Sequence, residues 1–447
     1  MKYKSLEDFL EGVRQSSDHQ PEYLQAVTEV MESIWPFVQK NPHYAEHALL
    51  ERLLMPERMI ICRVAWVDDK GEVQVNRGYR VQHSSAIGPY KGGMRFHPSV
   101  NLSIMKFLAL EQTFKNSLTM LPMGGGKGGS NFDPKGKSDG EIMRFCQAFM
   151  TEMFRHLGSD TDVPAGDIGV GAREIGYMTG MMKKLSNKTD CVFTGKGLSY
   201  GGSLIRPEAT GYGVVYFAQE MLLQRGRTFD GLRVSVSGSG NVAQFAIEKA
   251  MALGAKVVTV SDSGGTVVDE KGFTPDKLAT LMQIKNVEYG RISEYAGWVG
   301  AEYHPGIRPW AVPVDLALPC ATQNEIDESD AAALIKNGVI AVCEGSNMPS
   351  TIEATKLFEH NNVLFAPGKA SNAGGVATSG LEMSQNAMRL AWKREEVDQR
   401  LHGIMHKIHE ECLLHGRRPD GTVSYVHGAN IVGFTKVADA MIAQGII

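Results

Sequence analysis

The sequence lacks the features that would tie a chain to a membrane, a disulfide scaffold or a nucleic acid. It has no run of about 18 apolar residues, so no segment is predicted to span a bilayer. The six cysteines are scattered and include no CxxC pair, which excludes a zinc ribbon and a thioredoxin motif. Lys and Arg total 46 against 50 Asp and Glu, and the resulting net charge of -4 argues against binding nucleic acid through bulk positive charge.

The first residues also lack a targeting signal. Acidic residues interrupt the apolar ones directly after Met1, so neither a signal-peptide core nor an acid-poor transit peptide is predicted. Scattered thiols are typical of a reducing compartment, and we therefore expect a cytoplasmic protein. At roughly 150 residues per domain, the length predicts two or three domains, each able to bury its own core.

Glycine is the residue in excess. The chain has 49, which is about 11% of the sequence against a usual value of about 7%. Many of them fall in short runs between residues 121 and 213, with predicted helices at 139–157 and 172–185 between the runs. We interpret these runs as loops, and loops on a rigid scaffold are where chemistry concentrates.

The remaining pattern predicts an α/β protein of two domains. Helices are expected over residues 5–55 and 101–118, and a hairpin over 58–83. From Arg233 onward, short apolar strands alternate with helices, which is typical of βαβ units and a parallel sheet. The expected strands are 233–237, 256–260, 314–318, 339–343 and 363–366, and the expected helices are 241–253, 374–416 and 433–444. We expect a mixed α/β domain over 1–200, rejoined by 425–447, and a Rossmann-like domain over 201–424.

A dinucleotide-binding fingerprint follows the strand at 233–237. The run Gly238-Ser239-Gly240-Asn241-Val242-Ala243 reads GxGxxA and is followed by a predicted helix. The first glycine permits a tight turn, the second lets the backbone approach a pyrophosphate, and the small third residue allows close helix packing. The free N–H groups at the start of the helix would bind the phosphates. A glycine-rich turn in another α/β unit is the simpler alternative, but strand, helix and second strand all stand in the expected order.

The residues after the second strand leave the choice of coenzyme open. Asp262 lies near the spacing of about 20 residues expected for an acid that binds the ribose 2′-hydroxyl of NAD. Ser261 and Ser263, with Lys285 and Arg291, offer hydroxyls and two cations that could instead hold a 2′-phosphate. The two cations are also typical of a solvated helix face, so spacing does not decide between NAD and NADP.

Three lysines stand out before residue 130. Lys91 and Lys127 are flanked by glycines, and Lys115 is on a predicted helix. Several lysines in one pocket would lower the pKa of the least solvated one toward neutrality, while the others bind carboxylates. Asp167, in a further glycine run, could exchange protons with a substrate. A lone lysine is more often a solvated side chain. A P-loop is excluded, because Lys127 is followed by Gly128 where Ser or Thr is required.

A histidine-rich helix face is the only metal-like pattern. His402, His406 and His409 share one face of a predicted helix, a spacing that can bind zinc. Lys407 and Glu410 lie beside them and indicate a solvated helix, so no metal is predicted.

The longest motifs carry a resemblance to a known family. They are Gly88–Pro98, Leu121–Ser130, Asp162–Gly169, Arg206–Gly211, Pro319–Asn324 and Ser371–Gly375. Over essentially the whole chain, the sequence resembles the small hexameric type of glutamate dehydrogenase. The resemblance implies a homohexamer and a cleft that closes between a Rossmann-like domain and a mixed substrate and assembly domain.

The resemblance also implies a role for each site residue. Lys127 would be the catalytic lysine, and Asp167 would pass the proton to and from the amino group. The implied α-carboxylate ligands are Gln112, Lys115 and the backbone of Gly166, and the implied γ-carboxylate ligands are Lys91 and Ser379. The implied coenzyme residues are Thr210, Gly238, Ser239, Gly240, Asn241, Val242, Asp262, Ser263 and Lys285.

The implied reaction is the interconversion of L-glutamate with 2-oxoglutarate and ammonium. NADP-dependent members carry the Ser-Asp-Ser run seen at 261–263 and a later lysine such as Lys285, so NADP is favoured over NAD. Relatives that act on leucine or phenylalanine lack the γ-carboxylate lysine, so Lys91 indicates glutamate. The alternatives are a dehydrogenase of another amino acid, a catalytically silent nucleotide-binding regulator, and an anion-binding scaffold without turnover. No nucleic-acid or membrane partner is expected.

Overall fold

A computed structural model of the chain describes residues 3–446, which form two compact units. The first unit holds residues up to Leu204, the segment Ser379–Arg394 and the residues from Asn430 onward. The second holds Ile205–Thr378 and Glu395–Ala429. The sequence had placed 379–394 in the second domain. This segment belongs to the first unit because the second half of helix α14 (Gly374–Met388) forms hydrogen bonds with that unit. For example, Gln385 donates to Ser203 at 2.8 Å.

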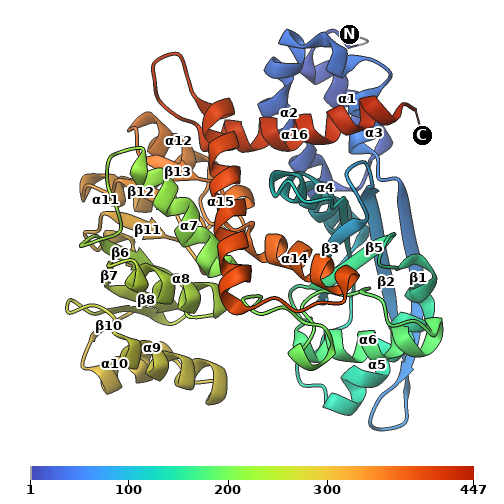
Figure 1. The fold of residues 1–447 in the computed structure, drawn as a ribbon, viewed down its shortest axis with the longest axis horizontal. Helices are drawn as coiled ribbons and strands as arrows, with labels where there is room; N and C mark the ends of the chain where they lie inside the picture. Colours follow the sequence, from blue (N-terminus) through green and yellow to red (C-terminus); the bar gives the residue numbers. More distant parts are fainter. Residues whose placement is uncertain (1–2, 447) are drawn as a thin grey trace. The chain divides into compact units, whose positions relative to one another are not determined.

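The first unit begins and ends with helices, as their apolar spacing predicted (Figure 1). They are α1 (Leu6–Ser16), α2 (Pro21–Lys40), η1 (Pro42–Ala45), α3 (Leu49–Leu54) and, at the C-terminal end, α16 (Tyr425–Gln444). Phe434 of α16 packs edge-on against Tyr44, whose hydroxyl donates to Asp439 at 2.8 Å. The last helix therefore shares a core with the first ones.

A five-stranded mixed sheet forms the centre of the first unit. Its strands are β1 (Arg58–Val67), β2 (Val73–Ser84), β3 (Tyr90–Phe96), β4 (Gly125–Ser130) and β5 (Asp162–Gly166), in the order β1-β2-β4-β3-β5. The predicted hairpin is β1 with β2, and β3 runs parallel to both β4 and β5. The three strands that carry the predicted site residues are thus adjacent.

Two of the predicted loops are wrong. The glycine run at 124–129 lies largely in β4, and the segment 162–166 is β5. Neither segment shows the β-branched alternation that predicts a strand, because their glycines serve close packing rather than burial of side chains. The Thr113 side chain of helix α4 (Leu102–Leu118) would lie 1.9 Å from a Cβ at Gly125, which shows how closely helix and strand approach.

Helices cover both faces of this sheet. Tyr79 and Val81 of β2 pack with Met105 of α4, whereas Val64 of β1 packs with Phe149 on the opposite face. The helices on that second face are α5 (Asp139–Met153), η2 (Phe154–His156) and α6 (Ala172–Ser186), and η3 (Leu198–Tyr200) follows them in the chain. α4, α5 and α6 begin within a residue of the predicted positions.

The second unit confirms the predicted parallel sheet. Its strands are β6 (Arg233–Val236), β7 (Lys256–Val257), β11 (Leu316–Leu318), β12 (Ala341–Cys343) and β13 (Leu364–Ala366), in the order β13-β12-β11-β6-β7. The helices are α7 (Ala209–Leu223), α8 (Asn241–Ala252), α9 (Pro275–Met282), η4 (Gln283–Val287), α10 (Ile292–Val299), η5 (Pro309–Ala311), α11 (Glu328–Lys336), α12 (Ile352–His360) and α13 (Gly368–Ser371). The chain continues from β6 to β7 on one side and returns to β11 on the other. The carboxyl end of β6 is therefore a topological switch point, where such sheets bind ligands.

The predicted strand 256–260 is divided between two sheets. It leaves the parallel sheet at Val258 and continues as β8 (Thr259–Asp262), which pairs with β9 (Gly265–Val268). β10 (Glu302–Pro305) completes this three-stranded sheet. Asp262 and the residues after it consequently lie on a separate small sheet.

The predicted helix 374–416 is two helices, α14 and α15 (Arg394–Gly416). Arg389 has a left-handed backbone with φ of 56°, which ends α14. Within residues 3–446, no helix combines the length and the apolar character needed to cross a membrane.

Candidate active site

Three adjacent strands of the first unit bring Lys127, Asp167 and Arg95 together. Lys127 is on β4, Arg95 on β3, and Asp167 directly follows β5. The Asp167 Oδ2 atom lies 3.2 Å from the Lys127 Nζ atom and 2.7 Å from the Arg95 Nε atom. Lys127 is buried, whereas a fifth of the Asp167 side chain is exposed. One carboxylate oxygen therefore holds two cations at the edge of the protein interior.

Glycines make this approach possible. A Cβ at Gly93 would lie 2.8 Å from the Asp167 Cβ and 3.3 Å from the Lys127 Nζ. A Cβ at Gly92 would lie 1.7 Å from the carbonyl oxygen of Gly126, which no side chain tolerates. The glycines of β3 thus create the space in which the lysine and the aspartate meet.

Burial and neighbouring charges shift both titrating groups. Burial lowers the pKa of the Lys127 ammonium, Asp167 partly opposes this, and the cations of Arg95 and Arg80 lower it further. Burial raises the pKa of the Asp167 carboxyl, but Lys127 and Arg95 outweigh burial and leave that pKa below its ordinary value. Lys127 therefore gives up its proton more readily than an exposed lysine, and Asp167 stays ionised.

A buried ion pair supports the strands beneath this centre. Arg80 of β2 and Asp162 of β5 are both fully buried, and the Arg80 Nε donates to the Asp162 Oδ2 at 2.8 Å. Arg80 also donates to the carbonyl of Gly92 at 3.1 Å, and Gln82 donates to Asp162 at 3.0 Å. The pair therefore ties β2 and β5 to the glycine strand β3.

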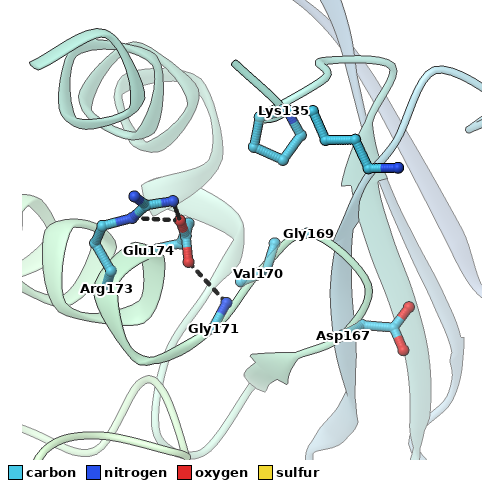
Figure 2. A pocket seen from close by; sticks show the side chains of 8 residues that line it. Lys135, Asp167, Gly169, Val170, Gly171, Arg173 and Glu174 are labelled. Atoms are coloured by element: carbon cyan, nitrogen blue, oxygen red, sulfur yellow. Dashed lines mark hydrogen bonds and ion pairs between the residues drawn. The ribbon is translucent and has the colours of Figure 1, made fainter. Parts of the chain in front are cut away.

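The cavity beside Asp167 is open to solvent (Figure 2). It measures about 490 Å³ and is lined by Pro134, Lys135, Asp167, Gly169, Val170, Gly171, Arg173 and Glu174. Figure 2 shows Asp167 on one side and the Arg173–Glu174 pair on the other, where Glu174 accepts the Gly171 N–H at 2.7 Å. The Asp167 carboxylate points away from that pair, toward Lys127 and Arg95, which do not line this cavity.

Lys91 lies on β3, four residues before Arg95, and is 1% exposed. Its Nζ donates to the Thr194 Oγ1 at 2.8 Å, and the Thr194 N–H donates to the carbonyl of Pro164 on β5. Thr194 is not predicted from the sequence, because no local pattern marks a threonine that contacts a lysine about a hundred positions away. A buried ammonium with hydroxyl neighbours favours an anionic partner.

Helix α4 presents Gln112 and Lys115 three positions apart, which places them on one face. A Cβ at Gly92 would lie 3.1 Å from the Gln112 Cγ, so this face meets β3 beside Lys91. Gln112 donates to Asn116 at 2.6 Å, and Asn116 in turn donates to the carbonyl of Lys91 at 3.0 Å. Gly166, the last residue of β5, pairs with Met94 of the same strand as Lys91. Ser379, in the part of α14 that belongs to the first unit, is 1% exposed.

The GxGxxA turn of the second unit has the geometry of a phosphate cradle. Gly238 follows β6 with φ of 80°, and its N–H donates to the Ser261 Oγ at 2.8 Å. A Cβ at Gly238 would lie 3.0 Å from the Cα of Ala321, at the carboxyl end of β11. Gly240 caps helix α8, and a Cβ there would meet nothing within 4 Å. The turn is thus packed behind and open in front, as a bound pyrophosphate requires.

The other predicted coenzyme residues surround this turn. Ser239 is buried and its carbonyl accepts a bond from Gln244. Val242 lies behind the turn, where a Cβ at Gly345 would touch it at 3.2 Å. The Asn241 side chain donates to the carbonyl of Pro207, three residues before Thr210 at the start of α7. Asn241 and Thr210 are therefore brought to the same end of two neighbouring helices.

Asp262 is engaged with the backbone. Its Oδ1 accepts the N–H of Gly264 at 2.8 Å, and its Oδ2 accepts the N–H of Ile292 at 3.2 Å. Arg291 donates to the Ser263 Oγ at 2.9 Å and is 63% exposed. Both Asp262 oxygens thus hold a turn and a helix start, while a hydroxyl and a cation face solvent beside them.

Lys285 lies in η4, a π-helical turn that follows α9. Its Nζ donates to the carbonyl of Gly290 at 2.8 Å, directly before Arg291. The segment Gly290–Arg291 therefore contacts both other groups expected near a 2′-phosphate: the Gly290 carbonyl binds Lys285, and Arg291 binds Ser263.

The histidine face of α15 is occupied by other contacts. His406 pairs with Glu220 at 3.1 Å, and the His409 Nε2 meets the Tyr425 hydroxyl at 2.9 Å. Burial lowers the pKa of His409 to about 4. Within residues 3–446, no group of three or more His, Cys, Asp or Glu side chains is arranged to hold a metal ion.

Known proteins resemble this chain along its whole length. Residues 56–184 match the model of the Glu/Leu/Phe/Val dehydrogenase dimerisation domain, and residues 201–445 match that of the glutamate/leucine/phenylalanine/valine dehydrogenases. The chain is 68% identical over 443 residues to the NADP-specific glutamate dehydrogenase of Escherichia coli K12, with 99% of each chain covered. It is 60% identical over 439 residues to the NAD(P)-specific glutamate dehydrogenase of Xylanibacter ruminicola, with 98% of this chain and 99% of that one covered.

Solved structures agree with this relationship. The structure of Plasmodium falciparum glutamate dehydrogenase 2 is 51% identical and superposes with a TM-score of 0.96, covering 99% of this chain and 98% of that one. The family that the sequence motifs indicated is confirmed, and so is the predicted α/β fold class. The chain belongs to the glutamate/leucine/phenylalanine/valine dehydrogenase family.

Proposed function

We propose that the chain is an NADP-dependent glutamate dehydrogenase. It converts 2-oxoglutarate, ammonium, NADPH and a proton into L-glutamate, water and NADP⁺, and catalyses the reverse reaction. Full-length relatives with this name at 68% identity support the activity. The observation that carries the choice of substrate within the family is Lys91, a buried ammonium beside the Thr194 hydroxyl.

A dicarboxylate substrate needs a cation at each end. Lys91, with Ser379 and Thr194, would hold the γ-carboxylate. Lys115, with Gln112 and the Gly166 N–H, would hold the α-carboxylate. Leucine, phenylalanine and valine place an apolar group where glutamate has its γ-carboxylate. Such a substrate would bring no carboxylate to the buried Lys91 ammonium, whereas glutamate would, and this difference favours glutamate.

Lys127 and Asp167 would carry out the proton transfers at C2 of the substrate. In the direction of glutamate synthesis, ammonia adds to the C2 carbonyl, and Asp167 accepts a proton from the incoming nitrogen. Lys127 would stabilise the resulting carbinolamine oxygen and protonate it as water leaves. In the reverse direction, the lowered pKa of Lys127 increases the neutral amine that activates water for attack on the iminium carbon.

The second unit would bind the coenzyme. The open space at Gly240 and the N-terminus of α8 fit a pyrophosphate. When bound, NADPH supplies the hydride that reduces C2 of the iminium. Both Asp262 oxygens already accept backbone N–H groups, and Ser263, Arg291 and Lys285 beside them offer a hydroxyl and two cations that suit a 2′-phosphate. This favours NADP, in agreement with the name of the Escherichia coli relative.

The test is a spectrophotometric assay of 2-oxoglutarate-dependent oxidation with ammonium, with NADPH and NADH in parallel. We expect turnover with a higher kcat/KM for NADPH. An absence of turnover with either coenzyme would contradict the enzyme and support a silent nucleotide-binding regulator. Intact Lys127 and Asp167 at 3.2 Å argue against that alternative.

A variant separates glutamate from other amino-acid substrates. We expect Lys91→Leu to reduce kcat/KM for glutamate severely, mostly through a raised KM, because the γ-carboxylate loses its cation. An unchanged kcat/KM for glutamate would indicate a dehydrogenase of another amino acid.

We also propose a homohexamer, with residues of the first unit forming the contacts. β1 is an edge strand of the sheet, and five apolar residues on one face of the β1–β2 hairpin are between 43% and 70% exposed. They are Met59, Ile61, Val67, Val73 and Val75. An uncovered apolar hairpin favours association with another copy of the chain. Light scattering coupled to size-exclusion chromatography would contradict the proposal if it returned a monomer.

Two further assignments complete the proposal. The first unit would be the substrate-binding and assembly domain, and the second the dinucleotide-binding domain. A cytoplasmic location is supported by six free cysteines, which suit a reducing compartment. Fractionation of cells that produce the protein would test this location.

A further inference from the structure

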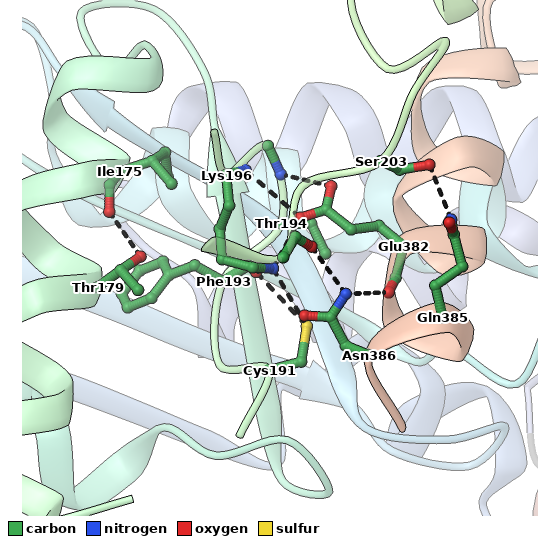
Figure 3. A network of polar contacts seen from close by, with 12 residues as sticks. Ile175, Thr179, Cys191, Phe193, Thr194, Lys196, Ser203, Glu382, Gln385 and Asn386 are labelled. Atoms are coloured by element: carbon green, nitrogen blue, oxygen red, sulfur yellow. Dashed lines mark hydrogen bonds and ion pairs between the residues drawn. The ribbon is translucent and has the colours of Figure 1, made fainter. Parts of the chain in front are cut away.

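A buried ion pair in the first unit ties helix α14 to the segment that carries Thr194. The Lys196 Nζ lies 2.7 Å from the Glu382 Oε1, and both side chains are almost completely buried (Figure 3). Lys196 also donates to the carbonyl of Phe193 and approaches the Cys191 sulfur at 3.5 Å. The lysine thus folds back over its own segment while it pairs with the helix.

Glu382 holds the backbone of the same segment. Its Oε2 accepts the N–H of Gly195 at 2.9 Å, and its Oε1 accepts the N–H of Lys196 at 3.3 Å. One carboxylate therefore binds two consecutive peptide groups and one ammonium. Such an arrangement fixes position as well as charge, because both backbone bonds are directional.

The fixed segment delivers Thr194 to Lys91. The Thr194 N–H bonds to Pro164 on one side, and the residues after Thr194 are held by Glu382 on the other. Between these anchors, its hydroxyl accepts a bond from the Lys91 Nζ at 2.8 Å. Thr194 is fully buried, so its place depends on these contacts and not on solvent.

The helix that carries Glu382 also carries Ser379. The two residues are three positions apart on α14 and lie on one face of it. Gly380, between them, sits so close to Leu121 that a Cβ would lie 2.6 Å from the leucine Cδ1. A displacement of α14 would therefore move Ser379 and the Thr194 segment together.

We propose that Lys196 and Glu382 are positioning residues for the γ-carboxylate end of the substrate site. The pair sets the Thr194 hydroxyl beside Lys91 and fixes the helix that carries Ser379, without touching the substrate itself. A buried ion pair is seldom more stable than a well-packed apolar pair, so its contribution here is geometric. The inference rests on the proposed function, because it assigns a task within that same site.

The experiment compares a dicarboxylate with its monocarboxylate analogue in Glu382→Gln. 2-Oxopentanoate has the chain of 2-oxoglutarate with a methyl group in place of the γ-carboxylate. We expect the ratio of kcat/KM for 2-oxoglutarate to that for 2-oxopentanoate to fall about tenfold, since small displacements of positioning groups cost this much or more. The fall should come from KM for 2-oxoglutarate, with KM for NADPH unchanged.

The matched control is Gln385→Met on the same helix. Gln385 is 3% exposed, and its hydrogen bonds go to Ser203 at 2.8 Å, to Leu381 and to Trp392 rather than to residues 193–196. It should lower the thermal midpoint and leave the substrate ratio at the wild-type value. If Glu382→Gln yields no folded protein, the double variant Lys196→Met/Glu382→Gln, which leaves no unpaired buried charge, carries the same test.

The outcomes are distinct. An unchanged ratio in a folded Glu382→Gln or double variant would overturn the positioning role and leave a purely structural pair. A fall in the ratio with Gln385→Met as large as with Glu382→Gln would overturn it as well. An absence of 2-oxoglutarate turnover in the wild-type enzyme would instead contradict the proposed function itself.

Discussion

Glycine serves different purposes at two sites of this chain, the β3–β4 pair of the first unit and the turn after β6 in the second. In β3 and β4, the glycines at 92, 93 and 125 have ordinary strand backbones, and what matters is the missing Cβ: neighbouring atoms occupy its place. In the turn after β6, Gly238 has a left-handed backbone, and Gly240 has empty space around it. The first set is required by packing of the protein against itself, and the second by the path of the chain and by room for a ligand.

This difference predicts that substitution in β3 is the most damaging. Gly92→Ala places a methyl group 1.7 Å from the carbonyl oxygen of Gly126 in the middle of a sheet. Paired strands on both sides prevent the backbone from moving away. We expect a loss of more than about 4 kcal/mol in the free energy of unfolding, and little soluble protein. Circular dichroism of the soluble fraction, with thermal unfolding, measures this.

The control is Gly180→Ala in α6 of the same unit. A Cβ at that position meets nothing within 4 Å, and alanine favours a helix over glycine. We expect Gly180→Ala to stabilise the protein by up to about 1 kcal/mol. A soluble Gly92→Ala variant with the wild-type thermal midpoint would contradict the close approach of β3 and β4.

The next largest effect separates the chemistry from the packing around it. Lys127→Met keeps the length of the side chain but removes the ammonium between Asp167 and Gly93. We expect kcat to fall by about 10²–10⁴-fold, as for loss of a general acid–base group, with little change in KM for NADPH. Because Asp167 keeps Arg95 as a partner at 2.7 Å, the thermal midpoint should stay close to that of the wild type. Steady-state kinetics in both directions would detect a smaller loss, which would argue against the catalytic role.

The turn after β6 offers a paired test of the second use of glycine. Gly238→Ala forces a left-handed alanine and should cost about 1–2 kcal/mol of stability. Gly240→Ala should change stability by less than about 1 kcal/mol. Both should raise KM for NADPH. The alanine at 238 distorts the turn, and the methyl group at 240 occupies the space for the pyrophosphate. Gly240→Ala with an unchanged KM for NADPH would show that the coenzyme does not approach this turn.

The smallest expected effect concerns the charge around Lys127. Four charged groups face this centre: Lys127, Asp167, Arg95 and Arg80. Arg95→Gln removes one cation, so the pKa of Asp167 and the pKa of Lys127 should both rise. Activity that depends on the neutral Lys127 amine then begins at a higher pH. We expect the acid limb of the kcat/KM profile to move upward by about one pH unit or less.

The same substitution changes the pH dependence of stability with a definite sign. The pKa of Asp167 is depressed in the folded state, so its contribution is present above the unfolded value and is lost as the pH falls through the folded one. In Arg95→Gln, the folded pKa lies closer to the unfolded one, so this contribution to stability should be smaller and its loss should be complete at a higher pH. An acid limb of the kcat/KM profile that moves to lower pH in Arg95→Gln would contradict the assigned charges.

Short sequence patterns predicted the features of this molecule that depend on neighbouring residues. The βαβ alternation and the GxGxxA turn follow from residues close together in the sequence, and both were found where expected. Thr194, Arg95 and the Lys196–Glu382 pair were missed, because their partners are tens to hundreds of residues away and only the fold brings them together. β4 was missed for another reason: a run of glycines with one lysine has no side-chain alternation to reveal a strand.

At Val258 the chain leaves the parallel sheet and enters the small sheet, and this has a consequence for how coenzyme preference can evolve. The groups that we propose to bind the 2′-phosphate of NADP lie on and beside β8 and β9, which form a small sheet of their own with β10. The pyrophosphate turn, by contrast, is built into the parallel sheet through Gly238 and Ala321. Substitutions that exchange one coenzyme for the other therefore fall on an appendage, so this preference can be altered in evolution, or by design, without disturbing the sheet that makes binding possible.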